Sequence, residues 1–281
     1  MLVLETLRAV QQSLKTAIET NKKIGFVPTM GALHEGHLSL ITKAKETCDL
    51  VVASIFVNPT QFNNPADLDK YPRMPEKDAA LLESVGCDFL FLPTTESIYP
   101  EGYEHLKMDL APLDEVMEGK YRPGHFAGVI DVVSRLFDIV KPTHAFFGRK
   151  DFQQVMIIKY MTKKLNLTIE IVVGETIREQ SGLAMSSRNL RLSEQQKQQA
   201  TVIYETLSFG KEMAPFLSPQ EVLIEMISII EASTLELEYL EIVDAETLLP
   251  LTDFWLPGAT ACVVAYCGEV RLIDNLELVT A

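Results

Sequence analysis

Apolar runs that favour β-strands alternate with amphipathic stretches through the first two thirds of the chain. The apolar runs lie at residues 24–29, 51–57, 89–93, 144–148 and 169–174. The stretches with helical spacing lie at residues 38–45, 75–85, 129–140 and 152–165. Near-continuous apolar strands separated by helices are typical of a parallel sheet covered on both faces. We therefore expect a doubly wound, Rossmann-like α/β fold here, with ligands bound beyond the carboxyl ends of the strands.

The pattern changes after about residue 177. Helical stretches at 193–213 and 219–233 precede strand candidates, which lie at residues 238–244, 259–266 and 269–273. This order is typical of a smaller α+β domain. No linker rich in proline or glycine marks the join, so the boundary rests on the change of pattern. We predict two domains, 1–176 and 177–281.

Composition and charge narrow the class of partner. The chain has 281 residues, of which 47% are hydrophobic and 23% charged, as in an ordinary globular protein. Its net charge of −14 opposes attraction to nucleic acid or to an anionic membrane. An acidic chain must bind a small anion with local donors, so Lys150 and Arg188 are informative. No basic and apolar leader and no run near the ~20 residues of a membrane span is visible, so we expect a cytoplasmic protein.

A turn with paired glycines and histidines follows the first predicted strand. Its residues are Met30, Gly31, Ala32, Leu33, His34, Glu35, Gly36 and His37. Glycine lets a ligand approach the backbone, and the start of a helix offers N–H groups to an anion. The two imidazoles can both reach such a ligand, so we predict a phosphate-binding turn. A capping turn with incidental histidines and a His-x-x-His metal site stay open, although no third ligand clusters nearby.

Amide side chains follow the second predicted strand. A central strand cannot continue through Pro59, so Asn58 and Gln61 are expected at the carboxyl end of that strand, beside the ligand-binding edge. Neutral amides at this place suit a substrate with hydroxyl and carboxylate groups. An Asn-Pro turn without a ligand is the alternative.

Residues 148–154 repeat the order of strand, glycine, charged residues and helix. Lys150 could neutralise a phosphate, and Asp151 could cap the helix or hold a hydrated Mg²⁺. Gln154 would point back toward the site one turn later. Helix capping alone is the alternative for this segment.

Three further segments carry candidate side chains. Residues 185–189 read Met-Ser-Ser-Arg-Asn, a set of donors for phosphate oxygens or else the lead-in to the helix near residue 193. Asp67 and Asp69 lie in a polar loop, either as a solvated face or as metal ligands. Arg122 and His125 lie in a tight loop, where they line the cleft or make structural hydrogen bonds.

The segments at residues 30–37, 56–62, 148–154 and 185–189 resemble, in order and spacing, the pantothenate synthetase (pantoate–β-alanine ligase) family. The HxGH pattern alone is shared by the wider nucleotidyltransferase superfamily and by class I aminoacyl-tRNA synthetases. Gln61, Gln154 and the Ser-Ser-Arg sequence distinguish this family from the others.

The resemblance implies an ATP-dependent ligase that works in two steps. ATP and pantoate give pantoyl adenylate and pyrophosphate, assisted by Mg²⁺, and the amine of β-alanine then releases pantothenate and AMP. Pantoate would contact Gln61 and Gln154, with Gln61 also near β-alanine, and His37 matches the family's proton donor. The implied ATP contacts are Met30 to His37, Gly148, Arg149, Lys150, Asp151, Ile177, Met185, Ser186, Ser187 and Arg188. The family resemblance also implies a homodimer.

Transfer of the α-phosphoryl group builds negative charge that the site must screen. We predict that His34, His37, Lys150 and Arg188 share this task with the helix start and Mg²⁺. The adenylate must also be kept from water, and the C-terminal domain is a candidate lid.

One departure from the family and two rival functions stay open. The family usually has glutamate where this chain has Arg149, a change that either strengthens phosphate attraction or has little effect if the side chain faces solvent. The rivals are another HxGH nucleotidyltransferase and a non-catalytic ATP-binding sensor. The nucleotidyltransferase would not require the pair Gln61 and Gln154, whereas the sensor would keep the loops without turnover, and Arg149 is the only hint of it.

Overall fold

The computed structural model describes residues 1–63 and 68–280, which form two compact units. Unit 1 contains Met1–Leu110, Arg122–Gly148 and Ile157–Glu175. Unit 2 contains Ala111–Tyr121, Arg149–Met156 and Thr176–Ala281. The last segment of unit 2 begins beside the boundary expected near residue 176, whereas the sequence pattern did not indicate the two short segments that precede it.

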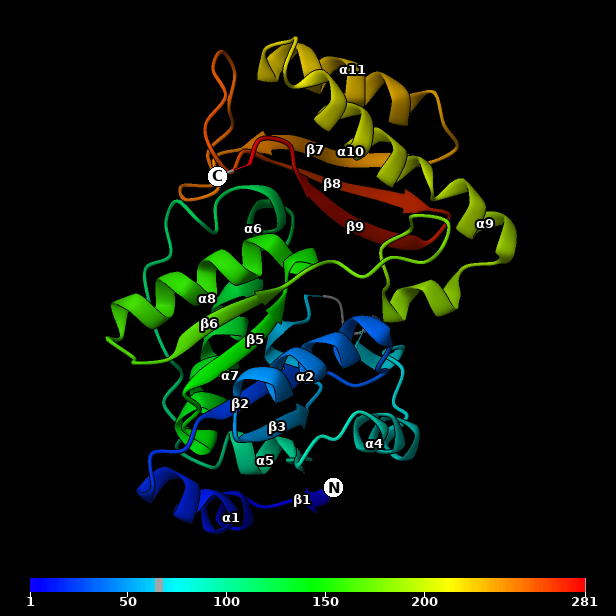
Figure 1. Ribbon diagram of the computed structural model, residues 1–281. Coiled ribbons are helices and arrows are strands. Elements are labelled where there is room, and N and C mark those ends of the chain that lie inside the picture. The colour runs from blue at the N-terminus through cyan, green and yellow to red at the C-terminus, as the bar shows by residue number, and fades with distance from the viewer. Residues whose placement is uncertain (64–67, 281) are drawn as a thin grey trace. The chain divides into compact units, whose positions relative to one another are not determined.

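Unit 1 is built on a parallel sheet with the strand order β1-β4-β3-β2-β5-β6 (Figure 1). The strands are β1 (Leu2–Leu4), β2 (Ile24–Thr29), β3 (Leu50–Ile55), β4 (Phe89–Phe91), β5 (His144–Gly148) and β6 (Glu170–Gly174). The order reverses at β2, which pairs with β3 on one side and β5 on the other. Ligands of doubly wound sheets bind beyond the carboxyl ends of strands at such a reversal.

The helices of unit 1 follow from this strand order. They are α1 (Leu7–Glu19), α2 (Glu35–Thr47), α4 (Pro75–Ser84), α5 (Thr95–Ile98) and α7 (His125–Val140), while α8 (Phe152–Lys164) has residues in both units. Right-handed connections place α2 and α4 on one face of the sheet and α1 and α7 on the other (Figure 1). The core under α2 consists of apolar side chains that include Leu33, Leu40, Ile41, Val51, Leu82, Leu90 and Phe146.

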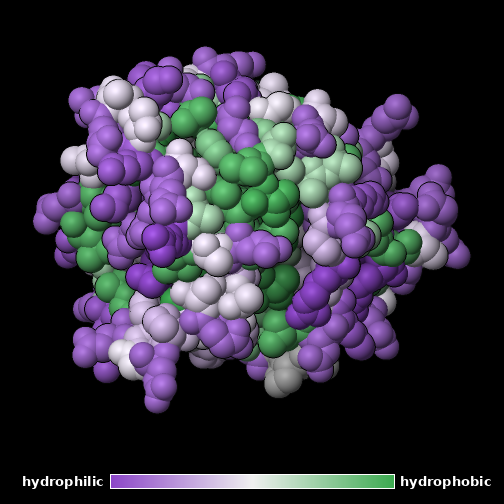
Figure 2. All heavy atoms as spheres, turned by 90° about the horizontal axis from the view of Figure 1, so that it is seen from below, coloured by the Kyte–Doolittle hydropathy of each residue, from purple (hydrophilic) through white to green (hydrophobic). Residues whose placement is uncertain are grey.

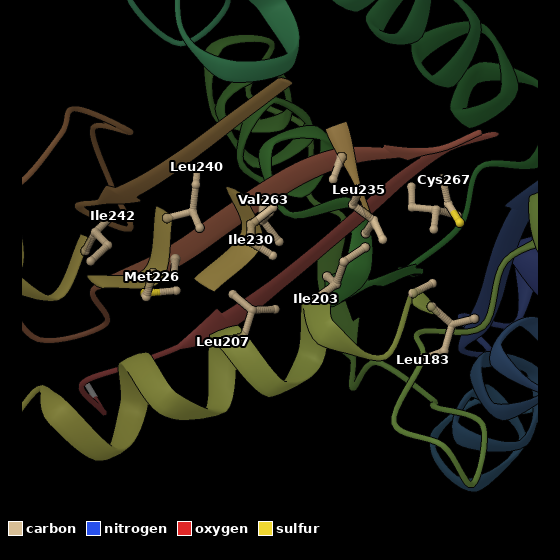
Figure 3. Packing of buried hydrophobic residues seen from close by; sticks show 14 of the residues in the cluster. Leu183, Ile203, Leu207, Met226, Ile230, Leu235, Leu240, Ile242, Val263 and Cys267 are labelled. Carbon is tan, nitrogen blue, oxygen red and sulfur yellow. The ribbon is translucent and has the colours of Figure 1, made fainter. Parts of the chain in front are cut away.

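Unit 2 contains an antiparallel sheet in the order β7-β8-β9, formed by Glu236–Val243, Thr260–Cys267 and Val270–Glu277. Its helices are α6 (Met117–Tyr121), α9 (Glu194–Gln199), α10 (Val202–Met213) and α11 (Pro219–Glu231). Figure 3 shows Leu207 on α10 and Val263 on β8 among the side chains that meet between helix and sheet. This apolar cluster is the core of the unit.

Local sequence explains where the helices of unit 2 begin. Ser193 caps α9 and Ser218 caps α11, and in each helix the third residue after the serine returns a side-chain bond to the serine backbone. Such capping boxes satisfy donors that a helix start leaves without partners. The predicted helix at 193–213 is in fact two helices, because α9 ends at Gln199 and α10 begins at Val202.

The predicted fold class is confirmed by this topology. The five strands expected in the first two thirds are present, and β1 is an addition that the sequence pattern did not indicate. Leu2–Leu4 is a short apolar run, and periodicity alone does not distinguish such a run from the start of a helix. Figure 2 shows the side of the molecule that lies at the bottom of Figure 1, where apolar side chains gather among hydrophilic ones. Leu2 and Val3 of the edge strand β1 are exposed.

None of the helices in the described residues has both the length and the apolar content needed to cross a bilayer.

Candidate active site

The turn at residues 30–37, here called the HxGH turn, connects β2 to α2 in unit 1. Gly31 and Ala32 have positive φ angles of 85° and 50°, a conformation that favours glycine and strains other residues. The N–H groups of Ala32 and Leu33 donate to the two carboxylate oxygens of Asp78, each at 2.8 Å. Asp78 lies on α4 and is 1% exposed. Its carboxylate therefore fixes the strained part of the turn.

The two histidines of the HxGH turn cap the start of α2. Nδ1 of His34 accepts a hydrogen bond from the N–H of Gly36 at 3.2 Å, and Nδ1 of His37 accepts one from the N–H of His34 at 3.3 Å. The two ring centroids are 4.1 Å apart. A neutral imidazole whose Nδ1 accepts carries its proton on Nε2. Both rings are thus set in the tautomer whose Nε2 atom is a donor.

These bonds change how the HxGH turn can bind an anion. From the sequence, the backbone N–H groups of the turn were expected to meet the phosphate. In the structure, those of Ala32, Leu33, His34 and Gly36 are already paired within unit 1. The capping turn that was left open as an alternative is present, and the histidines themselves form it. The imidazole Nε2 atoms are therefore the better candidates for contacts with a ligand.

Gly36 leaves room for the ring of His34. A Cβ atom at Gly36 would lie 2.9 Å from Cε1 and 3.0 Å from Nδ1 of His34. We expect Gly36→Ala to displace the imidazole and slow adenylate formation by about 10-fold or more, because small misplacements at a reacting centre are costly. Rapid-quench measurement of a single turnover checks this result. Thr47→Ala at the far end of the same helix is the control, and an unchanged rate for Gly36→Ala would show that the position of His34 is unimportant.

Gln61 lies beside the HxGH turn, because β2 and β3 end in register. Thr29 pairs with Ile55 at the carboxyl ends of these strands. The 3₁₀ turn η1 (Pro59–Gln61) follows β3, and Nε2 of Gln61 donates to Sδ of Met30 at 3.1 Å. The structure thus brings together a residue expected to contact the acid and a residue expected to contact ATP.

Asn58 holds Gln61 in place. Its Nδ2 atom donates to Oε1 of Gln61 at 3.3 Å and to the carbonyl of Gly128 at 3.1 Å. Its Oδ1 atom accepts from Thr60 and from the hydroxyl of Tyr99 at 3.0 Å. Burial, more than any neighbour, raises the pKa of Tyr99, so this hydroxyl remains a donor. Asn58 is 1% exposed, and this geometry favours a supporting role over a contact with substrate.

Arg122 and His125 make structural hydrogen bonds to the same segment. Nδ1 of His125 lies 2.9 Å from the carbonyl oxygen of Gln61, and Arg122 lies 3.2 Å from Nε2 of His125. Helix α7 approaches closely here, since a Cβ atom at Gly128 would lie 2.6 Å from the carbonyl oxygen of Thr60. The structural alternative that the sequence left open for Arg122 and His125 is therefore present.

The candidate residues after β5 divide between the units. Gly148 ends β5 in unit 1, and Arg149 to Asp151 form the 3₁₀ turn η2 in unit 2. Nζ of Lys150 lies 4.0 Å from the exposed carboxylate of Asp151. Gln154 is half-buried on α8. Its neighbour Gln153 is the buried one and bonds to the backbone of Leu113, Val116 and Glu118.

Arg149 does not face open solvent. Its guanidinium donates to a carboxylate oxygen of Glu277 on β9 at 3.1 Å, and both side chains are partly exposed. The charge reversal relative to the family residue is thus met by an acid within unit 2. A partly exposed ion pair of this kind adds little stability.

The segment at residues 177–189 forms a hairpin that brings Ile177 and Met185 together. The N–H of Met185 donates to the carbonyl of Ile177 at 3.0 Å, and Arg178 pairs with Ala184. Ser186 then caps the 3₁₀ turn η3 (Ser187–Arg191). A pocket in unit 2 is lined by side chains that include Lys150, Ser186, Arg188, Tyr204, Arg271 and Asp274. The two cationic residues expected to screen phosphate share this pocket.

No cluster of at least three histidine, cysteine or acidic side chains within residues 1–63 and 68–280 is arranged to hold a metal ion. Asp67 lies outside the described residues. Asp69 is exposed, and its metal role stays a prediction. The zinc alternative for His34 and His37 therefore gains no third ligand in the described part of the chain.

The residues that support the site from other elements were not predicted from the sequence. Asp78 is 46 residues from Ala32 along the chain, and at the start of a helix an acid is usually explained by the helix dipole. Asn275 on β9 bonds to the η2 turn. The only sequence feature that marks it is its place as a polar residue within an otherwise apolar strand.

Comparison with known proteins agrees with the motifs. A family model described as pantoate-beta-alanine ligase matches residues 2–277. Pantothenate synthetases from Porphyromonas gingivalis and Phocaeicola vulgatus are 46% and 48% identical over 280 and 283 residues, each covering 99% of this chain and 99% of the relative.

Solved structures agree as well. The crystal structure of pantothenate synthetase from Thermus thermophilus has a TM-score of 0.94 at 42% identity and covers 99% of this chain and 100% of that chain. Pantoate-beta-alanine ligase from Francisella tularensis, solved in complex with beta-gamma ATP and beta-alanine, has a TM-score of 0.81 at 38% identity, with 99% and 98% covered. Matches of this length and identity show that the chain belongs to the pantoate–β-alanine ligase (pantothenate synthetase) family.

Proposed function

We propose that this chain joins pantoate to β-alanine through a pantoyl adenylate, with ATP as the source of the adenylyl group. The observation that carries the proposal is the arrangement in unit 1 of two imidazoles with donor Nε2 atoms and the amide of Gln61 beside Met30. Imidazole donors suit a phosphate group, and an amide suits a carboxylate or hydroxyl group.

The first step places negative charge on the phosphoryl oxygens. The carboxylate of pantoate attacks the α-phosphorus, the bond to the β-phosphate oxygen breaks, and pyrophosphate leaves. His34 and His37 donate hydrogen bonds from Nε2 to these oxygens in our proposal, and Lys150 and Arg188 of unit 2 supply positive charge. Preorganised donors of this kind stabilise charge as it develops.

Recognition of the acid is assigned to Gln61 and Gln154. The amide of Gln61 is held by Asn58, so it is oriented before substrate arrives. Because Asn58 uses both its donor and its acceptor atoms within unit 1, we assign it to positioning Gln61. In the second step the amine of β-alanine attacks the acyl carbon of the adenylate as a free base, AMP leaves with the electron pair of the broken acyl–oxygen bond, and the new amide nitrogen releases one proton to water.

Magnesium would arrive with the nucleotide. Mg²⁺ keeps several waters and is usually bound by phosphate oxygens with one or two carboxylates. The exposed carboxylate of Asp151 beside Lys150 fits such a hydrated ion. When bound, the ion would neutralise part of the triphosphate charge.

The proposal extends to assembly and location. A homodimer in the cytoplasm is what the family resemblance implies. The exposed apolar residues Leu2 and Val3 on an edge strand support association with a second copy, because unpaired edges favour pairing with another chain. Light scattering during size-exclusion chromatography measures the number of copies directly. The lid role of the C-terminal domain stays a prediction.

One assay tests the reaction and both rivals. The purified protein is incubated with ATP, Mg²⁺, pantoate and β-alanine, with each acid omitted in turn. We expect sustained AMP release only with both acids, and exchange of pyrophosphate into ATP with pantoate alone. ATP binding without AMP release would support a sensor, and transfer to a phosphorylated acceptor without use of pantoate would support another nucleotidyltransferase.

A further inference from the structure

Strand β9 of unit 2 carries two adjacent buried polar residues, Asp274 and Asn275, which are 4% and 3% exposed. Nδ2 of Asn275 donates to the carbonyl oxygens of both Arg149 and Lys150, at 3.0 and 2.8 Å. One side chain thus holds two successive peptide groups of the η2 turn. The backbone from which the Lys150 side chain extends is fixed to the sheet of unit 2.

Asp274 fixes the hairpin that precedes the Ser-Ser-Arg sequence. Its two carboxylate oxygens accept from Nη1 and Nη2 of Arg178 at 2.5 and 3.0 Å. Nη1 of Arg178 also donates to the carbonyl of Gly182 at 3.1 Å, and its guanidinium lies 4.0 Å above the ring of Tyr204. Such a bidentate pair sets orientation as well as distance. The backbone of the hairpin is therefore fixed to the same point of β9.

Both fixed segments meet at one pocket. Lys150, Ser186 and Arg188 line it together with Asp274 itself. The N–H of Asn275 also donates to a carboxylate oxygen of Asp274 at 2.8 Å, which joins the two holding residues to each other. Two consecutive residues of one strand thus set the positions of two cations that lie far apart in the sequence.

A contribution to stability alone does not explain why an asparagine is buried at position 275. Within the described residues, its buried Oδ1 atom has no hydrogen-bond partner. A buried acceptor without a partner costs free energy and requires an explanation of its own. The Nδ2 atom of Asn275 provides that explanation, because it donates to both carbonyl oxygens of the η2 turn, those of Arg149 and Lys150.

We infer that Asp274 and Asn275 are positioning residues for adenylate formation, Asn275 acting through Lys150 and Asp274 acting through Arg188. The inference rests on the proposed function, since it assumes that these two cations screen the transferring phosphoryl group. Neither positioning residue needs to touch the substrate. A cation held away from its place by about 1 Å loses much of its effect on the rate.

The test is a double-mutant cycle read by pantoate-dependent exchange of pyrophosphate into ATP. We expect Asn275→Ala to lower kcat/KM for ATP by about 10- to 100-fold, while the KM for pantoate changes by less than about threefold. In a Lys150→Ala background, adding Asn275→Ala should lower kcat/KM for ATP by less than about threefold, because the effects of residues that act through one another are not additive. Asp274→Asn is paired with Arg188→Ala in the same way. Asn275→Leu, which keeps a similar volume and removes the Nδ2 donor without adding a charge, serves if the alanine variant does not fold.

Leu276→Ala is the matched control. Leu276 is the next residue of β9 and packs against the apolar core of unit 2, so its replacement lowers stability without touching the η2 turn. We expect its kcat/KM for ATP to stay near wild type even where its urea midpoint falls as far as that of Asn275→Ala. The inference would be overturned if Leu276→Ala lowered kcat/KM for ATP as much as Asn275→Ala does. It would also be overturned if Asn275→Ala lowered kcat/KM by its full factor in the Lys150→Ala background. Normal exchange in Lys150→Ala would contradict the proposed role of Lys150, and no exchange in the wild type would contradict the proposed function.

Discussion

Replacing Asp78 by alanine should lower the free energy of unfolding by about 2–5 kcal/mol, because two buried backbone donors lose their partner. These donors are the N–H groups of Ala32 and Leu33, which are 2% and 5% exposed. The same change should slow adenylate formation by about 100-fold, since the strained start of the HxGH turn loses its support. Urea unfolding measures the first effect, and a rapid-quench single turnover measures the second.

Glu76→Ala is the control for Asp78→Ala. Glu76 is an acid in the first turn of the same helix, but it is exposed. Its loss should cost less than about 1 kcal/mol, the value of a helix-dipole interaction, and should leave the rate unchanged. Asp78→Asn is a second probe, because it keeps one acceptor oxygen and turns an NH₂ group toward the other donor. Unfolding midpoints equal to wild type in both Asp78 variants would show that the carboxylate does not hold the turn.

The strands and helices with a regular pattern of apolar residues could be predicted from the sequence. The strands at residues 24–29 and 144–148 agree with the observed β2 and β5 residue for residue, because a buried parallel strand is a continuous apolar run. Strand β1 is apolar as well, but its three residues are too few to distinguish a strand from the start of a helix. The place of Gln61 at the carboxyl end of β3 was expected from Pro59, but its bond to Met30 was not.

The hydrogen bonds that orient the site could not be predicted in this way. Asp78 bonds across 46 positions and Asn275 across 125 and 126, and no local pattern encodes such a partner. The capping roles of His34 and His37 were local, but the ring nitrogen that accepts is fixed only by the geometry of the turn. The motifs identified which residue types form the site, whereas the tertiary contacts determined how their side chains are oriented toward a ligand.

Residues 148–154 form one continuous motif in the sequence but belong to two units of the structure. Gly148 ends a strand of unit 1, whereas the carbonyls of Arg149 and Lys150 are held by β9 of unit 2. A sequence motif that looks continuous thus has two structural supports. Changes in β9 should therefore affect Lys150 while leaving the HxGH turn of unit 1 as it is.

His37→Ala should have the largest effect on the chemistry. A positioned acid or donor contributes about 10²- to 10⁴-fold to a rate, so adenylate formation should slow by that factor. The loss of the cap to His34 should lower stability by only about 0.5–2 kcal/mol, because the core under α2 is untouched. A single-turnover rate near wild type would refute the role assigned to His37.

Two further variants separate the cap from the chemistry at position 37. In His37→Asn the side-chain oxygen takes the place of Nδ1 and can accept from the N–H of His34, but no donor stands where Nε2 was. In His37→Gln the amide nitrogen reaches the place of Nε2 and restores a donor. If His37 acts by donating a hydrogen bond to phosphoryl oxygens, the asparagine variant stays slow with near-normal stability and the glutamine variant recovers part of the rate. If His37 must give up its proton during the step, both variants stay equally slow, because an amide cannot act as a general acid.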